Sequence, residues 1–336
     1  MSQVRMDRIC IIMTSAIGDA VHVLPLVNAL KRHQPSSHIT WVLQPGPASL
    51  VRGHPAVDDV ILFRRRDGWR AFVALRRAFA ERQPFDAVLD LQVSFKAGIM
   101  TALAPAPVKL GFDRRRARDL TWLFTNRRLP PQPQRHIQDQ FLEFLDELGV
   151  PAEPLEWQLG PWPGEPPSEL MAGIDRPIAS LVIATSNPEK DWVPERWAEV
   201  VDHLYEHCGM QPVLAGGRSD RELETEAAIC QRARSPVVST LGCPLRELVA
   251  ILHASTLVIS LDTGPMHMAV ALGRPVIALI GYSDPRRIGP YRASTDLIID
   301  AFGTSDTPIT QAHRRGRMQT IAAADVIAKI ARRRGE

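Results

Sequence analysis

The chain has 336 residues, of which 45% are hydrophobic and 23% charged, and its formal net charge is +3 at pH 7. This length exceeds one ordinary core and predicts two domains, and no apolar run approaches the roughly 18 residues of a membrane-spanning helix. The four cysteines are scattered without a CxxC pair or a nearby set of histidines, so we expect reduced cytosolic thiols, no disulfide framework and no metal site.

The positive charge is concentrated in the first half, where residues 1–150 hold 21 Lys and Arg against 14 Asp and Glu. These clusters form either a solvated face or a surface for an anionic partner such as lipid phosphate. No nucleic-acid-binding motif or interleaved aromatic residues accompany them, so we expect no nucleic-acid partner. The arginines gather at 64–66, at 114–116 with 118, and at 127–128.

Apolar runs and helical periodicities alternate through the first half, as is typical of a parallel doubly wound sheet. Arg8 to Thr14 predicts a first strand and not a signal peptide, because its apolar run is short and Asp19 follows at once. The other elements expected here are a loop at 15–19, helices at 20–33, 69–82 and 136–148, and strands at 39–43, 57–63 and 87–91.

A Pro- and Gly-rich segment separates the two halves. It predicts a linker at 156–177 between a domain at 1–155 and a second domain at 178–336. We therefore expect an α/β protein of two Rossmann-like doubly wound domains facing a central cleft. The second half repeats the alternation, with strands at 178–184, 212–215, 237–239, 257–259 and 275–280 and helices at 194–207, 221–232, 245–253 and 321–333.

The stretch from 256 to 290 predicts a strand, a tight loop, a short helix and a second strand. Asp262 or Thr263 is placed to cap the helix, and Pro265 suits its first turn. Free N–H groups and partial positive charge at the carboxyl end of a strand favour a phosphorylated ligand. An ordinary strand-to-helix turn is the alternative.

Several polar side chains follow predicted strands. Asp19 either compensates the dipole of the first helix or acts as a general base, and His22, one turn further on, is either its partner or structural. Lys190 is either a partner for a departing diphosphate or a solvated loop lysine. Thr185 and Ser186 either donate to phosphate oxygens or cap a turn. No GxGxxG motif occurs, which argues against a dinucleotide-dependent dehydrogenase.

Ser15 to Pro25 and Leu261 to Ala269 resemble the two signature motifs of glycosyltransferase family 9, the ADP-heptose:lipopolysaccharide heptosyltransferases. Together these two motifs are specific, and the resemblance runs over nearly the whole chain. Three further segments are similar: Gly281 to Pro285, Asp90-Leu91-Gln92 with Lys96, and Lys109 to Phe112.

The resemblance implies a GT-B fold and an inverting transferase that needs no nicotinamide and no obligatory metal. It places the acceptor in the first domain, with Asp19 as the general base for the acceptor hydroxyl, and the nucleotide sugar in the second. The implied donor-binding residues are Lys190, Thr185 and Ser186 at the leaving ADP phosphates, Asp262 at the sugar hydroxyls, Thr263 and Gly264 at the diphosphate, His267 near the same ligand, and Asp220, for which Glu222 is a competing alignment.

The implied acceptor is Kdo-modified lipid A of the lipopolysaccharide inner core, which is phosphorylated and lies in the cytoplasmic leaflet. The enzyme would then be cytoplasmic, either soluble or held peripherally at the inner membrane. Arginine forks suit phosphate and carboxylate groups. The segments similar to the acceptor-binding region of the family contain Lys96, Arg118, Arg128 and His136.

Two departures from the family pattern border the implied nucleotide pocket. Val193 separates Trp192 from Pro194, whereas many relatives read Lys-x-Trp-Pro, and Tyr282 stands where a small residue or Pro is commoner. These changes leave another nucleotide sugar, such as an N-acetylhexosamine donor, as an alternative. A non-catalytic nucleotide-sugar-binding module is the alternative from another class.

Overall fold

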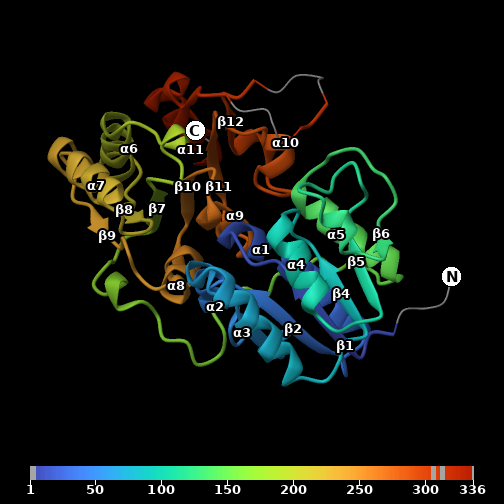
Figure 1. Cartoon of the computed structure of the whole chain (residues 1–336). Helices are drawn as coiled ribbons and strands as arrows, with labels where there is room; N and C mark the ends of the chain where they lie inside the picture. Colours follow the sequence, from blue (N-terminus) through green and yellow to red (C-terminus); the bar gives the residue numbers. More distant parts are fainter. Residues whose placement is uncertain (1–4, 304–307, 311–314, 335–336) are drawn as a thin grey trace. The chain divides into compact units, whose positions relative to one another are not determined.

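The computed structural model describes residues 5–303, 308–310 and 315–334. The chain divides into two compact units, residues 1–158 and residues 159–336. Each unit is an α/β structure built on its own parallel sheet of six strands (Figure 1). None of the helices in the described part of the chain is long and apolar enough to cross a membrane.

The first unit has a parallel sheet in the order β3-β2-β1-β4-β5-β6. The chain starts at β1, winds outward to β3, and then returns to β4 on the other side of β1, so the winding direction reverses between β1 and β4. The strands are β1 (Arg8–Ile12), β2 (His38–Leu43), β3 (Asp59–Leu62), β4 (Ala87–Asp90), β5 (Val108–Gly111) and β6 (Arg127–Arg128), and the helices are α1 (Ile17–His33), α2 (Pro45–Val51), α3 (Trp69–Ala80), α4 (Phe95–Leu103) and α5 (Ile137–Leu148).

Apolar side chains cover both faces of this sheet. Cys10 and Ile12 of β1 pack in one core with Leu75 of α3 and Met100 of α4, and Ile11, which points to the opposite face, is also fully buried. Helix α1 packs against α5 and is buried without interruption from residue 20 to residue 30. Burial on both faces explains why the central strands read as continuous apolar runs.

Helix α1 begins three residues earlier than predicted, at Ile17 and not at Ala20. Asp19 Oδ2 accepts the backbone N–H of Ala16 at 2.9 Å, which satisfies one of the donors left over at a helix start. The segment expected as a loop at 15–19 is therefore partly the first turn of the helix.

The second unit repeats the topology, with strand order β12-β11-β10-β7-β8-β9 and the reversal between β7 and β10. One large core joins residues of the sheet to Trp197 of α6, Ile229 of α7 and Val326 of α11. Its strands are β7 (Ile178–Val182), β8 (Gln211–Ala215), β9 (Val238–Ser239), β10 (Leu257–Leu261), β11 (Val276–Ile280) and β12 (Ile298–Asp300), and its helices are α6 (Pro194–Glu206), α7 (Asp220–Arg232), α8 (Leu245–Ala254), α9 (Gly264–Ala271), α10 (Pro285–Ile288) and α11 (Ala323–Arg334).

The Pro- and Gly-rich segment is tied to secondary structure on both sides of the division at residue 158. Asn28 of α1 donates to the backbone oxygen of Glu156 at 2.8 Å. Arg246 of α8 pairs with both carboxylate oxygens of Glu165 and lies over the ring of Trp162, 3.6 Å from its centroid. The greater part of this segment, from residue 159 onward, therefore belongs to the second unit.

Candidate functional site

Most of the predicted site residues lie where the winding of each sheet reverses. In open α/β sheets this point, at the carboxyl ends of the strands, is where ligands bind. The loops after β7 and β10 leave the second sheet at its reversal, and the loops after β1 and β4 leave the first.

Lys190 and Asp262 are in direct contact in the second unit. Lys190 Nζ lies 2.7 Å from Asp262 Oδ2 and 3.4 Å from the backbone oxygen of Asp262. Lys190 ends a short 3₁₀ helix after β7, and Asp262 follows β10, which pairs with β7 in parallel. The side chain of Asp262 is only 6% exposed and that of Lys190 is 21% exposed. Lys190 is therefore not a solvated loop lysine.

Helix α9 begins beside this pair. Thr263 occupies its N-cap position but makes no side-chain capping bond, and Asp262 directs its carboxylate to Lys190. The predicted side-chain cap is therefore wrong. A helix start without such a cap leaves N–H donors for water or for an anion. Gly264 opens the helix, and His267 lies one turn in and is 7% exposed.

Aromatic and polar side chains complete the surroundings of Lys190. The ring centroid of Tyr282 lies 5.9 Å from Lys190 Nζ, within the range of a cation–π contact. The Thr185 hydroxyl donates to the backbone oxygen of Asn187 at 2.7 Å and accepts its N–H at 3.1 Å, so it forms a turn. Ser186 is exposed. Of the two roles predicted for Thr185, the turn is the one visible in the fold.

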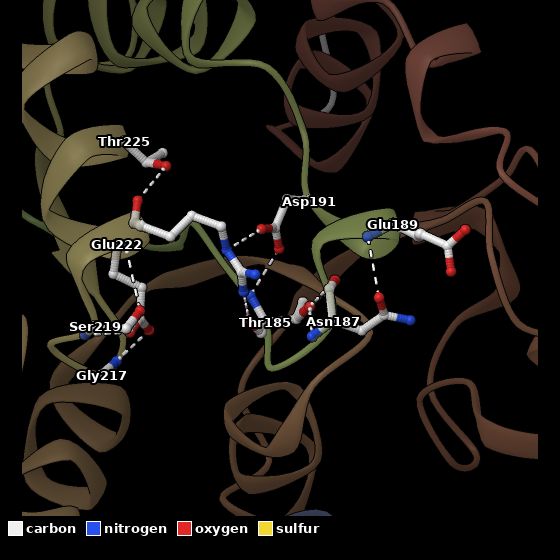
Figure 2. A network of polar contacts seen from close by, with 9 residues as sticks. Thr185, Asn187, Glu189, Asp191, Gly217, Ser219, Glu222 and Thr225 are labelled. Atoms are coloured by element: carbon white, nitrogen blue, oxygen red, sulfur yellow. Dashed lines mark hydrogen bonds and ion pairs between the residues drawn. The ribbon is translucent and has the colours of Figure 1, made fainter.

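The two competing acidic positions of α7 have different surroundings. Asp220 is the first residue of the helix and is exposed. Glu222 accepts the N–H groups of Gly217 at 2.6 Å and Ser219 at 2.9 Å, and Ser219 in turn caps the helix (Figure 2). Glu222 is therefore the carboxylate that lies against the Gly216-Gly217 turn after β8.

The reversal of the first sheet is closed by a side-chain contact between its two loops. Gln92 follows β4 and Thr14 follows β1. The Oε1 atom of Gln92 accepts hydrogen bonds from the N–H of Thr14 at 2.9 Å and from the Thr14 hydroxyl at 2.7 Å. Asp19 lies in the first turn of the helix that follows. Its place in the first turn suits compensation of the helix dipole, and its bond to Ala16 also orients the carboxylate.

His22 and His136 meet where α1 packs on α5. His22 is buried, and its Nδ1 lies 3.1 Å from Oε1 of Gln138. The two imidazole rings are 5.6 Å apart and nearly perpendicular. His136 is the N-cap of α5 and accepts the N–H of Gln138. Both histidines therefore help to join the two helices.

A cavity of about 360 Å³ opens at the reversal of the first sheet. It contains two cationic side chains, Arg65 and Lys96, and one carboxylate, Asp119, next to apolar surface. Of the predicted acceptor-binding residues, Lys96 lines it. Its other lining residues are Thr14, Ser15, Gln44, Phe63, Gln92, Ser94, Phe95 and Met100.

The other predicted acceptor-binding arginines lie near the loop that leads into β6. Arg118 is exposed. Arg128 donates to the backbone oxygens of Trp122 at 3.0 Å and Thr125 at 3.4 Å, so it braces this loop. Sequence reasoning did not single out Arg65, although it stands in the cluster at 64–66.

Two of the clustered arginines are structural, which corrects the expectation that each cluster forms one basic surface. Arg116 is 3% exposed and pairs with Asp113 at 2.5 Å and with Glu143 of α5 at 2.7 Å. Arg127 pairs with Glu147 at 2.7 Å. Arg116 is therefore buried with two carboxylates, and the charge of the partly exposed Arg127 is paired with Glu147.

Asp90 ends β4 directly beneath the Gln92 contact. Burial raises the pKa of its carboxyl to about 7, against the opposing effect of the N–H of Gln92, which donates to Oδ1 at 3.3 Å. The side chain is 3% exposed. Asp90 is therefore a buried group that gains or loses its proton near neutral pH.

Comparison with known sequences gives the family. A sequence model of glycosyltransferase family 9 (heptosyltransferase) matches residues 72–311. The lipopolysaccharide core heptosyltransferase OpsX of Haemophilus influenzae is 30% identical over 298 residues, which are 88% of this chain and 84% of that protein.

Solved structures agree with this assignment. The glycosyltransferase of family 9 from Veillonella parvula has a TM-score of 0.80 at 22% identity, over 97% of this chain and 96% of that one, which supports the fold. The E. coli heptosyltransferase WaaC, solved with ADP, has a TM-score of 0.77 at 26% identity, over 97% of this chain and 99% of that one. The two doubly wound units are those of a GT-B type fold. This chain belongs to glycosyltransferase family 9, the heptosyltransferase family, and is a glycosyltransferase.

Proposed function

We propose that this enzyme transfers heptose from ADP-heptose to the inner core of lipopolysaccharide, with inversion at the anomeric carbon. The observation that carries the proposal is the Lys190–Asp262 pair at the start of α9. It places a cation and a helix N-terminus together, as a diphosphate requires. Similarity to a lipopolysaccharide core heptosyltransferase and to a structure solved with ADP supports this choice of donor.

The second unit binds the donor in this proposal. Lys190, Ser186 and the first N–H groups of α9 hold the ADP phosphates, and Asp262 accepts hydrogen bonds from sugar hydroxyls. The remaining donor-binding residues are Thr185, Thr263, Gly264, His267 and an acidic residue of α7, for which Glu222 now fits better than Asp220 because it faces the Gly216-Gly217 turn.

The first unit binds the acceptor. The cavity at its sheet reversal offers Arg65 and Lys96 to phosphate or carboxylate groups, and its apolar wall suits the carbon face of a sugar ring. Arg118, Arg128 and His136 are the further acceptor-binding residues in this proposal. The cavity reaches Ser15, four residues before Asp19.

In the reaction, the bond from the anomeric carbon to the diphosphate is replaced by a bond to the acceptor oxygen. Asp19 takes the proton of the acceptor hydroxyl while the hydroxyl oxygen bonds to the anomeric carbon. The bond from that carbon to the diphosphate oxygen breaks, and its electron pair leaves with ADP. Lys190 and the α9 N-terminus stabilise the negative charge on the departing diphosphate.

A peripheral contact with the inner membrane, from the cytoplasmic side, is part of the proposal. Trp69 is 71% exposed, and Leu120 and Leu123 are 54% and 57% exposed. Exposed arginines at 64–66, 70 and 114–115 lie close to them in the sequence, and a mixture of apolar and basic side chains suits an anionic bilayer surface. Sedimentation with vesicles containing phosphatidylglycerol should recover the protein, and recovery that is unaffected by Trp69→Ser would contradict this surface.

Thermal melts test the choice of donor. A ligand that binds only the folded state raises the melting temperature, with a stabilisation of about 2.7 kcal/mol at a hundred times its Kd. We expect ADP and ADP-heptose to raise the melting temperature and UDP and UDP-N-acetylglucosamine to leave it unchanged. If only the uridine nucleotides raised the melting temperature, the assignment of ADP-heptose as the donor would be wrong. If none of the four ligands raised it, the protein would bind no nucleotide sugar among them.

A further inference from the structure

One arginine ties the loop that carries Lys190 to helix α7. Arg221 Nε lies 2.8 Å from Asp191 Oδ2, and its guanidinium also donates to the backbone oxygen of Thr185. Asp191 Oδ1 accepts the N–H of Thr185 at 2.8 Å. Figure 2 shows Thr185 and Asp191 facing each other across this loop. The two ends of the loop and the arginine therefore form a closed set of three contacts.

This set lies directly beside Lys190 in the chain. Between its ends the loop is a single tight turn, in which the N–H of Lys190 donates to Asn187 and that of Asp191 to Pro188. The next residue, Trp192, is buried, and its Nε1 donates to the backbone oxygen of Ile321 at 2.9 Å. Asp191 joins Lys190 to this anchored residue, so a shift of Asp191 moves the backbone of Lys190.

The ion pair between Arg221 and Asp191 joins opposite charges, as a contact that holds the loop requires. Burial raises the pKa of Asp191, while the N–H of Thr185 and the positive charge of Arg221 act in the opposite direction. Arg221 thereby favours the ionised carboxylate, which accepts the N–H of Thr185 and forms an ion pair with the guanidinium.

We propose that Arg221 is a positioning residue of the nucleotide-sugar site, which holds the 185–191 loop and, through it, sets Lys190 against Asp262. This inference rests on the proposed function, because it assigns Lys190 to the ADP phosphates. Arg221 itself acts through Asp191 and Thr185 and is not assigned a contact with substrate.

A double-mutant cycle on ADP affinity tests the proposal. Arg221→Ala should raise the Kd for ADP by about tenfold or more, because a displacement of about 1 Å already weakens an oriented contact strongly. Arg221→Lys, which keeps a cation near Asp191, should recover part of the loss. In the Lys190→Ala background, Arg221→Ala should add nothing. Equal effects in both backgrounds would overturn the proposal, because residues that act independently are additive.

A second measurement needs no nucleotide and keeps the two proposals separable. The rate at which acetic anhydride modifies Lys190, followed by peptide mass spectrometry, should rise several-fold in Arg221→Ala, since Lys190 would leave Asp262, while exposed Lys96 in the other unit reacts as before. Arg232→Ala is the matched control: it removes an ion pair between α7 and Glu195 of α6 and should leave Lys190 unchanged. An unchanged Lys190 rate in Arg221→Ala would overturn the inference. If the wild-type enzyme did not bind ADP, the assignment of the donor would be wrong, but the effect of Arg221 on Lys190 would not be contradicted.

Discussion

Lys190 Nζ and Asp262 Oδ2 lie 2.7 Å apart although 72 residues separate them in the chain. The contact exists because β7 and β10 are parallel neighbours, so the loops that follow them leave the sheet at the same edge. Asp262 is nearly buried, and a buried carboxylate needs a partner to remain charged. The pair therefore holds a cation at the start of α9.

Lys190→Ala should weaken ADP binding and heptose transfer together. Loss of a charge-assisted contact of about 1.5–3 kcal/mol predicts a rise in Kd for ADP of roughly tenfold to a hundredfold, measured by calorimetric titration. Lys329→Ala is the control, because Lys329 is another lysine of the second unit that donates to a backbone oxygen, that of Asp296. An unchanged Kd would remove Lys190 from the donor site.

Asp19→Asn should leave ADP binding intact and reduce transfer by roughly two to four orders of magnitude, the usual share of a general base. An amide oxygen still accepts the N–H of Ala16, so the start of α1 should persist. Asp325→Asn is a matched control, because Asp325 accepts the N–H of Ala322 at the start of α11 in the same way. Rates of ADP release report the outcome, and near wild-type turnover in Asp19→Asn would end the assignment.

Arg116→Ala should destabilise the first unit by about 3–5 kcal/mol, because it leaves the carboxylate of Asp113 buried without its cation. It also removes one of the two arginines that pair with Glu143, the other being Arg135. Arg115→Ala, at the exposed neighbour, should change the free energy of unfolding by about 0.5 kcal/mol or less. Urea denaturation compares the two variants. Equal stabilities would mean that the buried cluster contributes nothing net.

Asp90 predicts a pH dependence of stability. Its pKa is about 7 in the folded chain against an ordinary value of 3.8, so between these values the folded state keeps a proton that the unfolded state releases. Raising the pH through this window therefore lowers the free energy of unfolding, by up to about 4 kcal/mol at pH 7 and above.

Asp90→Asn cannot release that proton, so its stability relative to wild type should rise from about pH 4 to about pH 7 and then level off. Urea denaturation at several pH values measures this difference. A pH-independent difference for Asp90→Asn would mean that Asp90 stays ionised in the folded chain.

The sequence predicts the central strands of both sheets, because they read as continuous apolar runs. It also places Lys190 and Asp262 after strands of the second half, but their contact depends on the pairing of β7 with β10. Helix α4 escapes periodicity because it is apolar around most of its surface and contains Gly98, which packs against Phe124. Strand β5 has a lysine, Lys109, among its four residues and β6 consists of two arginines, so neither reads as an apolar run.

Sequence patterns do not predict contacts that depend on how helices pack against a sheet or against each other. Arg116 reads as part of an arginine cluster, and only the packing of α5 shows that Glu143 buries it. Arg221 reads as a surface residue of α7, and its contact with Asp191, 30 residues earlier, depends on the packing of α6 and α7. The start of α1 at Ile17 likewise depends on one local bond, from Ala16 to Asp19.

The most direct test of heptose transfer is to incubate the purified enzyme with ADP-heptose and Kdo-modified lipid A and to analyse the product by mass spectrometry and NMR. We predict one heptose added for each ADP released, with the anomeric configuration opposite to that of the donor. Transfer with retained configuration, or transfer from a uridine nucleotide sugar and none from ADP-heptose, would contradict the proposal.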